Sequence, residues 1–445
     1  MASATFTTAT EMPAINLRPA FWWIAIALGG IFFITEHSFD TSLSDAFTQS
    51  ADEMQATASG GNSLRRVAFL MMGGLGILGL CYGAGRRFRI DGMGGPLLCF
   101  YGLFCLASIL WSHEFSMTAR RLATFVCFCG CAFGVARMLR GREIVRLSIY
   151  APLIFLIIGV LAELALGSFR PWAGEYRFSG TQHPNTTGLG IASLCFASLA
   201  LGFESRRSWY FFAICGVGVF FLILTKSRTS AAGLVFAIAL LWTLSTRLSV
   251  KLTLIALAGW MLSGIVVLLL LAGVDLAGEV SDAALMGRKE QAESLTGRLP
   301  IWTELMPYAA QNWLLGFGYD SFWTPTHIAD VSEEVQWGVR EAHSAYLDTI
   351  LSVGVIGLSL LVAALLAHLA RAGRLYVRSK HPLAGWLFAL LVFGLINAFT
   401  ESAMAMTLYI PFLMITGMLH LSFFAEDDFQ SRDPQASSAF EGDVA

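Results

Sequence analysis

Long apolar runs recur along almost the whole chain, and short polar stretches separate them. A helix that crosses a membrane needs about 20 mostly apolar residues, and twelve runs approach this length. They lie at 20–35, 67–84, 95–111, 122–138, 148–166, 187–203, 209–225, 230–246, 252–273, 345–369, 383–400 and 405–423. The pattern predicts an all-α, polytopic membrane protein with about twelve transmembrane helices. No small-residue cleavage site follows the first run, so we expect it to remain as a span.

Two of the polar stretches are long. Residues 36–66 are rich in Ser, Thr and Ala, and we expect little chemistry there. Residues 274–344 contain aromatic and apolar positions at helical spacing, which predicts short helices lying on the membrane surface. The predicted organisation is 1–273 (nine spans), 274–344 (a structured loop carrying part of the site), 345–424 (three spans) and 425–445 (a disordered cytoplasmic tail).

Composition supports this interpretation, since the chain is 56% hydrophobic and only 13% charged. A soluble domain carries roughly twice that share of charge. The net charge of −2 gives no sign of a nucleic-acid partner. The cysteines all fall in apolar runs, and we interpret them as small buried hydrophobic residues rather than disulfide partners. They are Cys81, Cys99, Cys105, Cys127, Cys129, Cys131, Cys195 and Cys215.

Basic residues cluster in the short loops on one side of the predicted bundle, for example at 137–146 and 371–380. The positive-inside rule assigns that side to the cytoplasm. Both termini then lie in the cytoplasm, and the long loop at 274–344 lies on the outer face.

Three arginines on the predicted outer side are candidate anion ligands. Arg228 lies between two apolar runs, where a charge is costly unless it faces a polar cavity or an anion. Arg298 lies in the long loop, and Arg177 precedes the run at 187–203. Guanidinium groups bind phosphate oxygens bidentately and stay charged. Three of them together would suit a pyrophosphate, although a single arginine at a membrane edge is more often a topology or snorkelling residue.

Other polar residues near this side are weaker candidates. Lys226 and Arg340 are interpreted first as interfacial anchors. His183 suits either a loop cap or a substrate contact. Glu163, which is costly in lipid, is expected to pair with an outer arginine.

His343 occupies the last polar position before the run at 345–369, and Glu341 could orient its imidazole or remain a surface residue. The pattern His343-Ser344, nine residues, Gly354, two residues and Gly357 resembles the histidine motif of a known superfamily. This is the O-antigen ligase and Wzy-type polysaccharide polymerase superfamily, which includes exopolysaccharide polymerases. Its other motifs resemble Ser227-Arg228, Gly297-Arg298 with Ile301-Trp302, and Arg177, Gly180 and His183-Pro184-Asn185.

The resemblance implies a GT-C-like membrane glycosyltransferase of the bacterial inner membrane with a periplasmic active site. Members move a glycan from undecaprenyl pyrophosphate to an acceptor hydroxyl. The expected catalytic residues are His343, Arg228 and Arg298. The expected substrate-binding residues are Arg177, His183, Asn185, Glu341, Lys226 and Arg340. The expected partners are the lipid-linked donor, a lipid-linked or lipid A acceptor, membrane lipid and other polysaccharide export proteins.

In the predicted mechanism the arginines stabilise the charge of the departing pyrophosphate. His343 accepts the proton of the attacking hydroxyl, or orients that hydroxyl, and the anomeric centre inverts. No metal and no cofactor is expected, because the outer loops lack an acidic cluster with ligand spacing and arginines can replace a divalent cation.

Three functions stay open at this point. A polymerase of lipid-linked repeat units is favoured, since residues 316–323 resemble exopolysaccharide polymerases. A ligase that attaches finished glycan to lipid A core is the second. A lipid-linked sugar transporter or flippase is the third, but such proteins place ionisable groups near the middle of the bilayer, whereas these spans are nearly free of charge.

Overall fold

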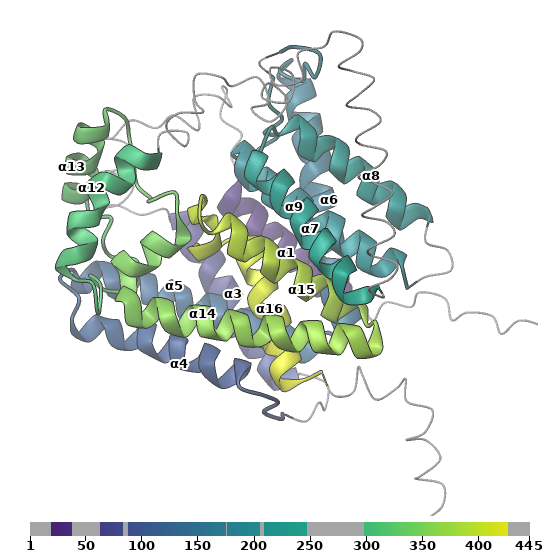
Figure 1. Cartoon of the computed structure of the whole chain (residues 1–445), viewed down its shortest axis with the longest axis horizontal. Coiled ribbons are helices and arrows are strands. Elements are labelled where there is room, and N and C mark those ends of the chain that lie inside the picture. The colour runs from purple at the N-terminus through teal and green to yellow at the C-terminus, as the bar shows by residue number, and fades with distance from the viewer. Residues whose placement is uncertain are drawn as a thin grey trace, which may run out of the picture.

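A computed structural model describes residues 19–37, 63–82, 88–174, 176–204, 209–246 and 298–425. This part of the chain is a bundle of helices without strands (Figure 1). Its α-helices are α1 (Pro19–Glu36), α3 (Ser63–Tyr82), α4 (Gly94–Ala107), α5 (Phe115–Met138), α6 (Gly141–Ala165), α7 (Pro184–Gly202), α8 (Trp209–Leu224), α9 (Arg228–Ser245), α12 (Arg298–Gln311), α13 (Pro325–Val335), α14 (Ala345–Ser379), α15 (Pro382–Asn397) and α16 (Tyr409–Phe423). Two short 3-10 turns, η2 (Ser108–Leu110) and η4 (Ser402–Ala405), complete it.

Eleven of the twelve predicted spans coincide with helices, although several helices extend further than the apolar run. The run at 252–273 lies outside the described residues. Six described helices are long and apolar enough to cross a membrane: α1, α3, α5, α6, α7 and α14. Five shorter apolar helices accompany them. The structure thus confirms a polytopic helical membrane protein, while the number twelve stays a prediction.

Glycines let two of the spans touch backbone to backbone. A Cβ at Gly76 of α3 would lie 2.7 Å from the backbone of Gly130, and one at Gly79 would lie 2.6 Å from Gly134, both on α5. Small residues at such spacing are the usual means by which helices associate in lipid.

The described part of the long loop confirms the predicted short helices, α12 and α13. Their apolar side chains form a small core of their own, with Ile301, Leu305, Phe322 and Val331 fully or almost fully buried. The two helices stand at one end of the molecule, beside the start of α14 (Figure 1). Their position on a membrane surface stays a prediction.

The helix α14 is broken near its start, which the apolar pattern does not reveal. Gly354 has φ +66° and ψ −174°, outside the helical region. The backbone after α12 fills the break: Phe317 N–H donates to Leu351 C=O at 2.8 Å, and Val355 N–H donates to Trp313 C=O at 2.8 Å. Groups freed by the break are therefore satisfied by protein, as is required at membrane depth.

The same contact explains the glycines that follow His343 in the sequence. A Cβ at Gly354 would lie 2.1 Å from the Leu314 carbonyl oxygen, and one at Gly357 would lie 2.3 Å from the Val353 side chain. Only glycine fits at these two positions and at the positive φ of Gly354. The two glycines therefore allow the segment that follows α12 to pack against α14. Because α12 begins at Arg298, this packing also helps to position Arg298.

The prediction that the cysteines are buried is confirmed for three of the eight positions, and three others are partly buried. All eight are free, and Cys105, Cys131 and Cys195 are buried. Cys81 and Cys99 are exposed on the surface of the chain, so they are not the buried residues that we expected.

Candidate functional site

His343 sits in a tight turn between α13 and α14. Its backbone has φ +48°, a left-handed conformation, which turns the chain sharply before the Ser344 side chain caps α14. The imidazole Nδ1 lies 3.1 Å from Glu341 Oε1. Its ring stacks on Trp337 at 5.8 Å between centroids. Two contacts thus orient the imidazole, and Glu341 faces the histidine.

A buried set of hydrogen bonds holds this turn. The Trp302 indole N–H of α12 donates to Ala342 C=O at 2.9 Å, and Ala342 N–H donates to Asp348 at 3.1 Å. The Ser402 hydroxyl donates to the same carboxylate and accepts from Ser344 N–H at 3.1 Å. The histidine turn is therefore fixed to α12, α14 and η4 together.

A chain of polar contacts links α12, α7 and the segment after α15. Arg298 Nη2 donates to Glu401 Oε1 at 2.8 Å in an ion pair that is about nine-tenths buried on both sides. Asn185 Nδ2 donates to the same oxygen at 2.8 Å. Arg177 Nη2 in turn donates to Asn185 Oδ1 at 3.0 Å, and its Nε donates to Thr225 C=O at 3.0 Å. Glu401 is thus the centre of a network joining three distant segments.

Arg228 completes the group from a fourth segment. It is the first residue of α9, after Ser227 at the N-cap position, and is half-buried. Within the described ranges, its guanidinium forms no ion pair and no side-chain hydrogen bond. Its charge nevertheless reaches Arg298, since it helps to lower the pKa of that residue.

Electrostatics at Arg298 and Glu401 reflect burial of charge. Burial is the main reason that the pKa of Arg298 is lowered; Arg228 lowers it further, whereas Glu401 and Glu341 oppose the change. Burial also raises the pKa of Glu401 to about 7, against the opposing charges of Arg298 and His343. The charges of Arg228 and Arg298 therefore repel each other, and an anion between them would relieve this repulsion.

For the pair of His343 and Glu341, the mutual interaction outweighs the effect of burial on each pKa. Burial on its own would lower the pKa of His343, but the hydrogen bond and charge of Glu341, aided by Glu401, outweigh it and raise the pKa. Burial would raise the pKa of Glu341, but the His343 hydrogen bond and the charges of His343, Arg340 and His183 lower it overall. Both shifts favour the charged forms of the pair. Because Nδ1 faces Glu341, Nε2 is the nitrogen available to a substrate.

The remaining predicted site residues lie at the edge of this group. Lys226 Nζ donates to Gly174 C=O, so its ammonium group is engaged by a loop. Arg340 is exposed and acts on Glu341 through its charge. Neither residue is placed among the buried contacts around Glu401.

His183 has the role of a helix cap. It is the N-cap residue of α7, and its Nδ1 accepts from Asn185 N–H at 3.2 Å. Its side chain is exposed. The structure therefore shows a capping contact for His183, while a substrate contact stays a prediction.

The prediction that Glu163 pairs with an outer arginine is wrong. Instead of an arginine, the carboxylate accepts from the Tyr176 hydroxyl at 2.5 Å and from the backbone N–H groups of Ser179 and Gly180 at 3.0 and 2.8 Å. The chain after α6 folds back over the end of that helix, and its own amides reach the carboxylate before any arginine can.

Glu401 is not among the candidate site residues predicted from the sequence. Its signal was present, because a carboxylate stands in the four residues between the apolar runs at 383–400 and 405–423. The argument applied to Arg228, that charge at a membrane edge needs a reason, applies equally to Glu401.

The arrangement combines a cationic anion site with an oriented imidazole. Arg298, Arg228 and Arg177 come from α12, α9 and the turn before α7, and His343 lies within electrostatic reach of Arg298. In the described part of the chain, no group of three or more His, Cys, Asp or Glu residues is placed to hold a metal ion. The predicted absence of a metal stays a prediction.

Comparisons with known proteins address the same region. Residues 211–362 match the family model described as O-Antigen ligase. That stretch contains Arg228, Arg298 and His343, but neither Arg177 nor Glu401. The chain is also 24% identical over 317 residues to the exopolysaccharide production protein ExoQ of Rhizobium meliloti (strain 1021). The aligned region covers 68% of this chain and 71% of that relative.

These two matches confirm the resemblance to the O-antigen ligase and Wzy-type polymerase superfamily. With the apolar helices, they support a membrane enzyme of the ligase or polymerase type, acting in polysaccharide biosynthesis.

Proposed function

We propose that the protein is a membrane glycosyltransferase that polymerises lipid-linked repeat units of an exopolysaccharide or O-antigen. It takes the glycan from undecaprenyl pyrophosphate and transfers it to an acceptor hydroxyl. The observation that carries the proposal is the meeting of Arg228, Arg298 and His343 from three separate elements in one electrostatic group.

The donor pyrophosphate binds between Arg228 and Arg298. In the free protein Arg298 already has a counter-ion, Glu401. The donor therefore has to compete with this carboxylate, and protonation of Glu401 removes the competitor. Two negative charges then replace one, and the repulsion between the guanidinium groups is relieved.

The transfer step uses the imidazole. The acceptor oxygen attacks the anomeric carbon, the bond from that carbon to the phosphate oxygen breaks, and the lipid pyrophosphate leaves with the electron pair. His343 Nε2 takes the hydroxyl proton, while Glu341 on Nδ1 stabilises the imidazolium. In-line attack inverts the anomeric centre. Arg228, Arg298 and Arg177 stabilise the charge on the leaving group, so the step proceeds without a metal.

The choice between polymerase and ligase rests on the similar proteins. The similarity to an exopolysaccharide production protein favours polymerisation, whereas the family description favours ligation to lipid A core as the second candidate. Glycan analysis of a deletion strain separates them. An accumulated single repeat unit supports the polymerase, and long unattached chains support the ligase.

A transporter of the same lipid-linked sugar is the third candidate. Purified protein supplied with a lipid-linked donor distinguishes it, because an enzyme breaks the sugar–phosphate bond without a transmembrane gradient. Translocation of intact donor without cleavage would contradict the proposal.

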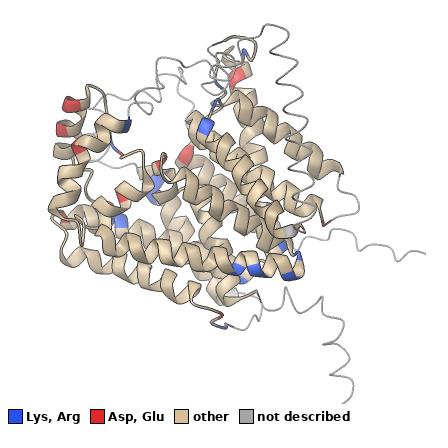
Figure 2. Ribbon diagram, viewed as in Figure 1, with Lys and Arg blue, Asp and Glu red and all other residues tan. Residues whose placement is uncertain are grey.

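The orientation completes the proposal, with the site in the periplasm and both termini in the cytoplasm of an inner-membrane protein. Arg371, Arg374 and Arg378 gather at the C-terminal end of α14 (Figure 2), and the His343 turn lies at the other end. The positive-inside rule favours a cytoplasmic location for the basic end. A membrane-impermeant thiol reagent tests this with a single cysteine placed at Trp337 in a cysteine-free background: labelling in intact spheroplasts is expected.

A further inference from the structure

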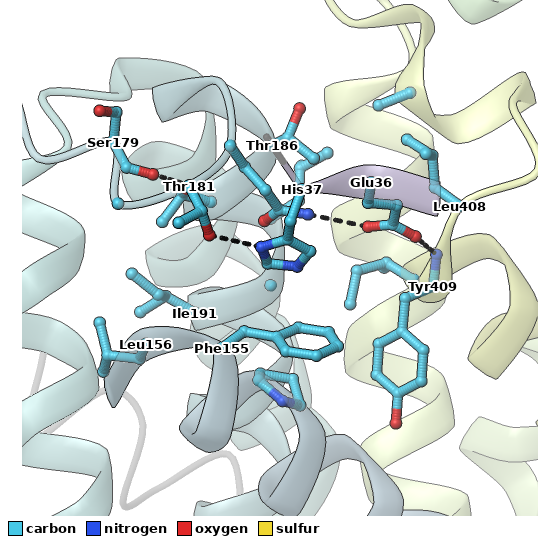
Figure 3. Close-up of a pocket in the computed structure, with 18 of the residues that line it drawn as sticks. Glu36, His37, Phe155, Leu156, Ser179, Thr181, Thr186, Ile191, Leu408 and Tyr409 are labelled. Carbon is cyan, nitrogen blue, oxygen red and sulfur yellow. Dashed lines mark hydrogen bonds between the residues drawn. The ribbon is translucent and has the colours of Figure 1, made fainter. Parts of the chain in front are cut away.

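A cavity with several polar residues in its lining lies beside residues 178–182 and the first turns of α7 (Figure 3). Its walls come from the end of α1, the middle of α6, residues 178–182, the first turns of α7 and the start of α16. The cavity measures about 40 Å³, which is room for several water-sized groups. None of the predicted site residues lines it.

The polar lining of this cavity has a defined hydrogen-bond pattern. Gln182 Nε2 donates to Glu36 Oε2 at 2.9 Å, and Tyr409 N–H donates to Glu36 Oε1 at 2.5 Å. His37 Nδ1 lies 2.5 Å from Thr181 Oγ1. Its other nitrogen, Nε2, is buried and has no hydrogen-bond partner in the described part of the chain. A buried polar atom without a partner is unfavourable, so a group that forms a hydrogen bond with this nitrogen would stabilise it.

Aromatic neighbours fix the direction of that nitrogen. The His37 ring stacks on Phe33 at 4.5 Å and meets the Phe155 ring edge-on at 4.5 Å. Burial lowers the pKa of His37 to about 4, so the ring is neutral at pH 7. A neutral imidazole has one donor and one acceptor nitrogen, and a hydroxyl group can satisfy either.

The charge of the lining decides which ligand class fits. The lining contains the Glu36 carboxylate and no lysine or arginine. The charge of Arg65 reaches Glu36, but Arg65 does not line the cavity, so a phosphate would have no cationic partner in the lining. Hydroxyl groups over aromatic side chains, here Phe155 and Tyr409, meet no such obstacle. The lining therefore favours a neutral polyhydroxylated group.

We propose that this cavity binds the hydroxyl groups of one neutral sugar residue of the glycan, with His37 Nε2 and the Glu36 carboxylate as its polar contacts. The proposal rests on the proposed function for the identity of the glycan. Residues 177–183 and the first turn of α7, here called the 177–187 loop, contact Glu36 through Gln182 on one side and Glu401 through Asn185 on the other. The proposal adds a saccharide subsite on the Glu36 side, with the anion site on the Glu401 side. The sugar belongs to the donor or to the acceptor, and both present the same chemistry.

A matched pair of variants tests the subsite. His37→Asn keeps a polar atom at the position of Nδ1, next to Thr181, and removes the one at Nε2; His37→Gln does the reverse. The full-length protein is reconstituted in nanodiscs, and binding of methyl α-glucopyranoside and methyl β-galactopyranoside is followed by saturation-transfer NMR. We expect binding to the wild type, at least tenfold weaker binding to His37→Asn, and binding within about threefold of wild type for His37→Gln.

Two controls complete the design. Arg228→Ala should bind the glycosides like the wild type, and sodium pyrophosphate should not displace them. Equal saturation transfer in wild type and His37→Asn, or none in the wild type with either glycoside, would show that the cavity holds water only and would overturn the proposal. A His37→Asn variant that fails to fold is recognised by its thermal transition, and Tyr409→Leu, which removes an aromatic wall, then replaces it.

Steady-state kinetics show whether the sugar in the cavity belongs to the donor or to the acceptor. They also test this inference independently of the proposed function. With a lipid-linked donor and a soluble acceptor oligosaccharide, His37→Asn raises the KM of the substrate whose sugar occupies the cavity, with a smaller change in kcat. If the wild type makes no polymer but still binds glycosides through His37, the proposed function fails and the saccharide subsite stands. If polymer forms at the normal KM values in His37→Asn, the subsite fails alone.

Discussion

On both sides of the 177–187 loop, a side-chain amide of the loop donates a hydrogen bond to a glutamate carboxylate, but the two sides differ in charge. On one side the Asn185 amide donates to Glu401, and on the other the Gln182 amide donates to Glu36. Glu401 is buried and follows the end of α15, whereas Glu36 is partly buried and ends α1. Glu401 forms an ion pair with the Arg298 guanidinium at 2.8 Å, whereas Gln182 and Tyr409 donate hydrogen bonds to Glu36 and Arg65 acts on it through its charge.

This one difference decides what each side can bind. Near Glu401, Arg177 is linked through Asn185 and Arg228 acts on Arg298 through its charge, and this group of arginines suits a pyrophosphate. Beside Glu36, the cavity offers a neutral imidazole and no lysine or arginine in its lining, so hydroxyl groups are preferred. In the proposed arrangement the phosphate site and the saccharide subsite lie on either side of this loop, so a change on one side should affect the other only through the loop.

The largest effect is expected on the charged side, at His343. His343→Ala should lower kcat by roughly 10²–10⁴-fold, the usual contribution of a positioned base, and leave insertion into the membrane unchanged. The measurement is polymer formed per mole of purified protein, with glycoside binding as the control for the neutral side. Polymer at near-normal levels would exclude a role as base.

The next effect concerns the geometry of the cation. Arg228→Lys keeps the charge and loses the planar fork, so we expect a loss in kcat/KM of roughly 10²-fold, the lower end for removing a fixed donor. Lys226→Ala is the matched control two residues away. The Lys226 ammonium group already donates to Gly174 C=O, and its loss should change kcat/KM by less than about twofold. Full activity of Arg228→Lys would mean that a point charge is sufficient.

A smaller effect is expected from pH, and it acts on KM and on kcat through two different groups. The pKa of Glu401 is raised to about 7, so this side chain is mostly protonated at pH 6 and mostly ionised at pH 8. Since the ionised form competes for Arg298, the donor KM of the wild type should rise from pH 6 to pH 8 by up to about tenfold. In Glu401→Gln the donor KM should stay flat over the same range.

The turnover number should also rise from pH 6 to pH 8, but through His343 rather than Glu401. The pKa of His343 is raised by Glu341, so the base form is lost as the pH falls and kcat should decrease towards pH 6. Glu401→Gln should retain this decrease, which distinguishes the two groups. Parallel KM curves for the wild type and Glu401→Gln would show that the carboxylate does not compete with the donor.

The spans and the cationic residues could be predicted from the sequence because their signals are local. Apolar runs of membrane length need only hydropathy, and Arg228 stands out because charge is rare in such surroundings. The pairing of Glu163 could not be predicted in the same way. It depends on the path of residues 168–180, which fold back so that the amides of Ser179 and Gly180 reach the carboxylate.

The break in α14 and the neutral cavity show the same limit. Gly354 lies within an apolar run, and nothing in its neighbours indicates that the backbone after α12 fills the break. The cavity joins Glu36 to Tyr409 across 373 positions of the chain. Contacts at such separation follow from tertiary packing, which hydropathy does not encode.

The smallest expected effect concerns His183, which lies on the loop between the two sides. Its Nδ1 caps α7 by accepting from Asn185 N–H, and asparagine at an N-cap position does the same. His183→Asn should therefore keep kcat/KM within about threefold of the wild type. His183→Ala loses the cap, at a typical cost of about 1 kcal/mol, and should lower the thermal transition slightly. Because Asn185 follows two residues later and contacts Glu401, a loosened cap should raise the donor KM before it alters glycoside binding. A tenfold loss in His183→Asn, with the cap intact, would instead place the imidazole against the substrate and move His183 into the charged side of the loop.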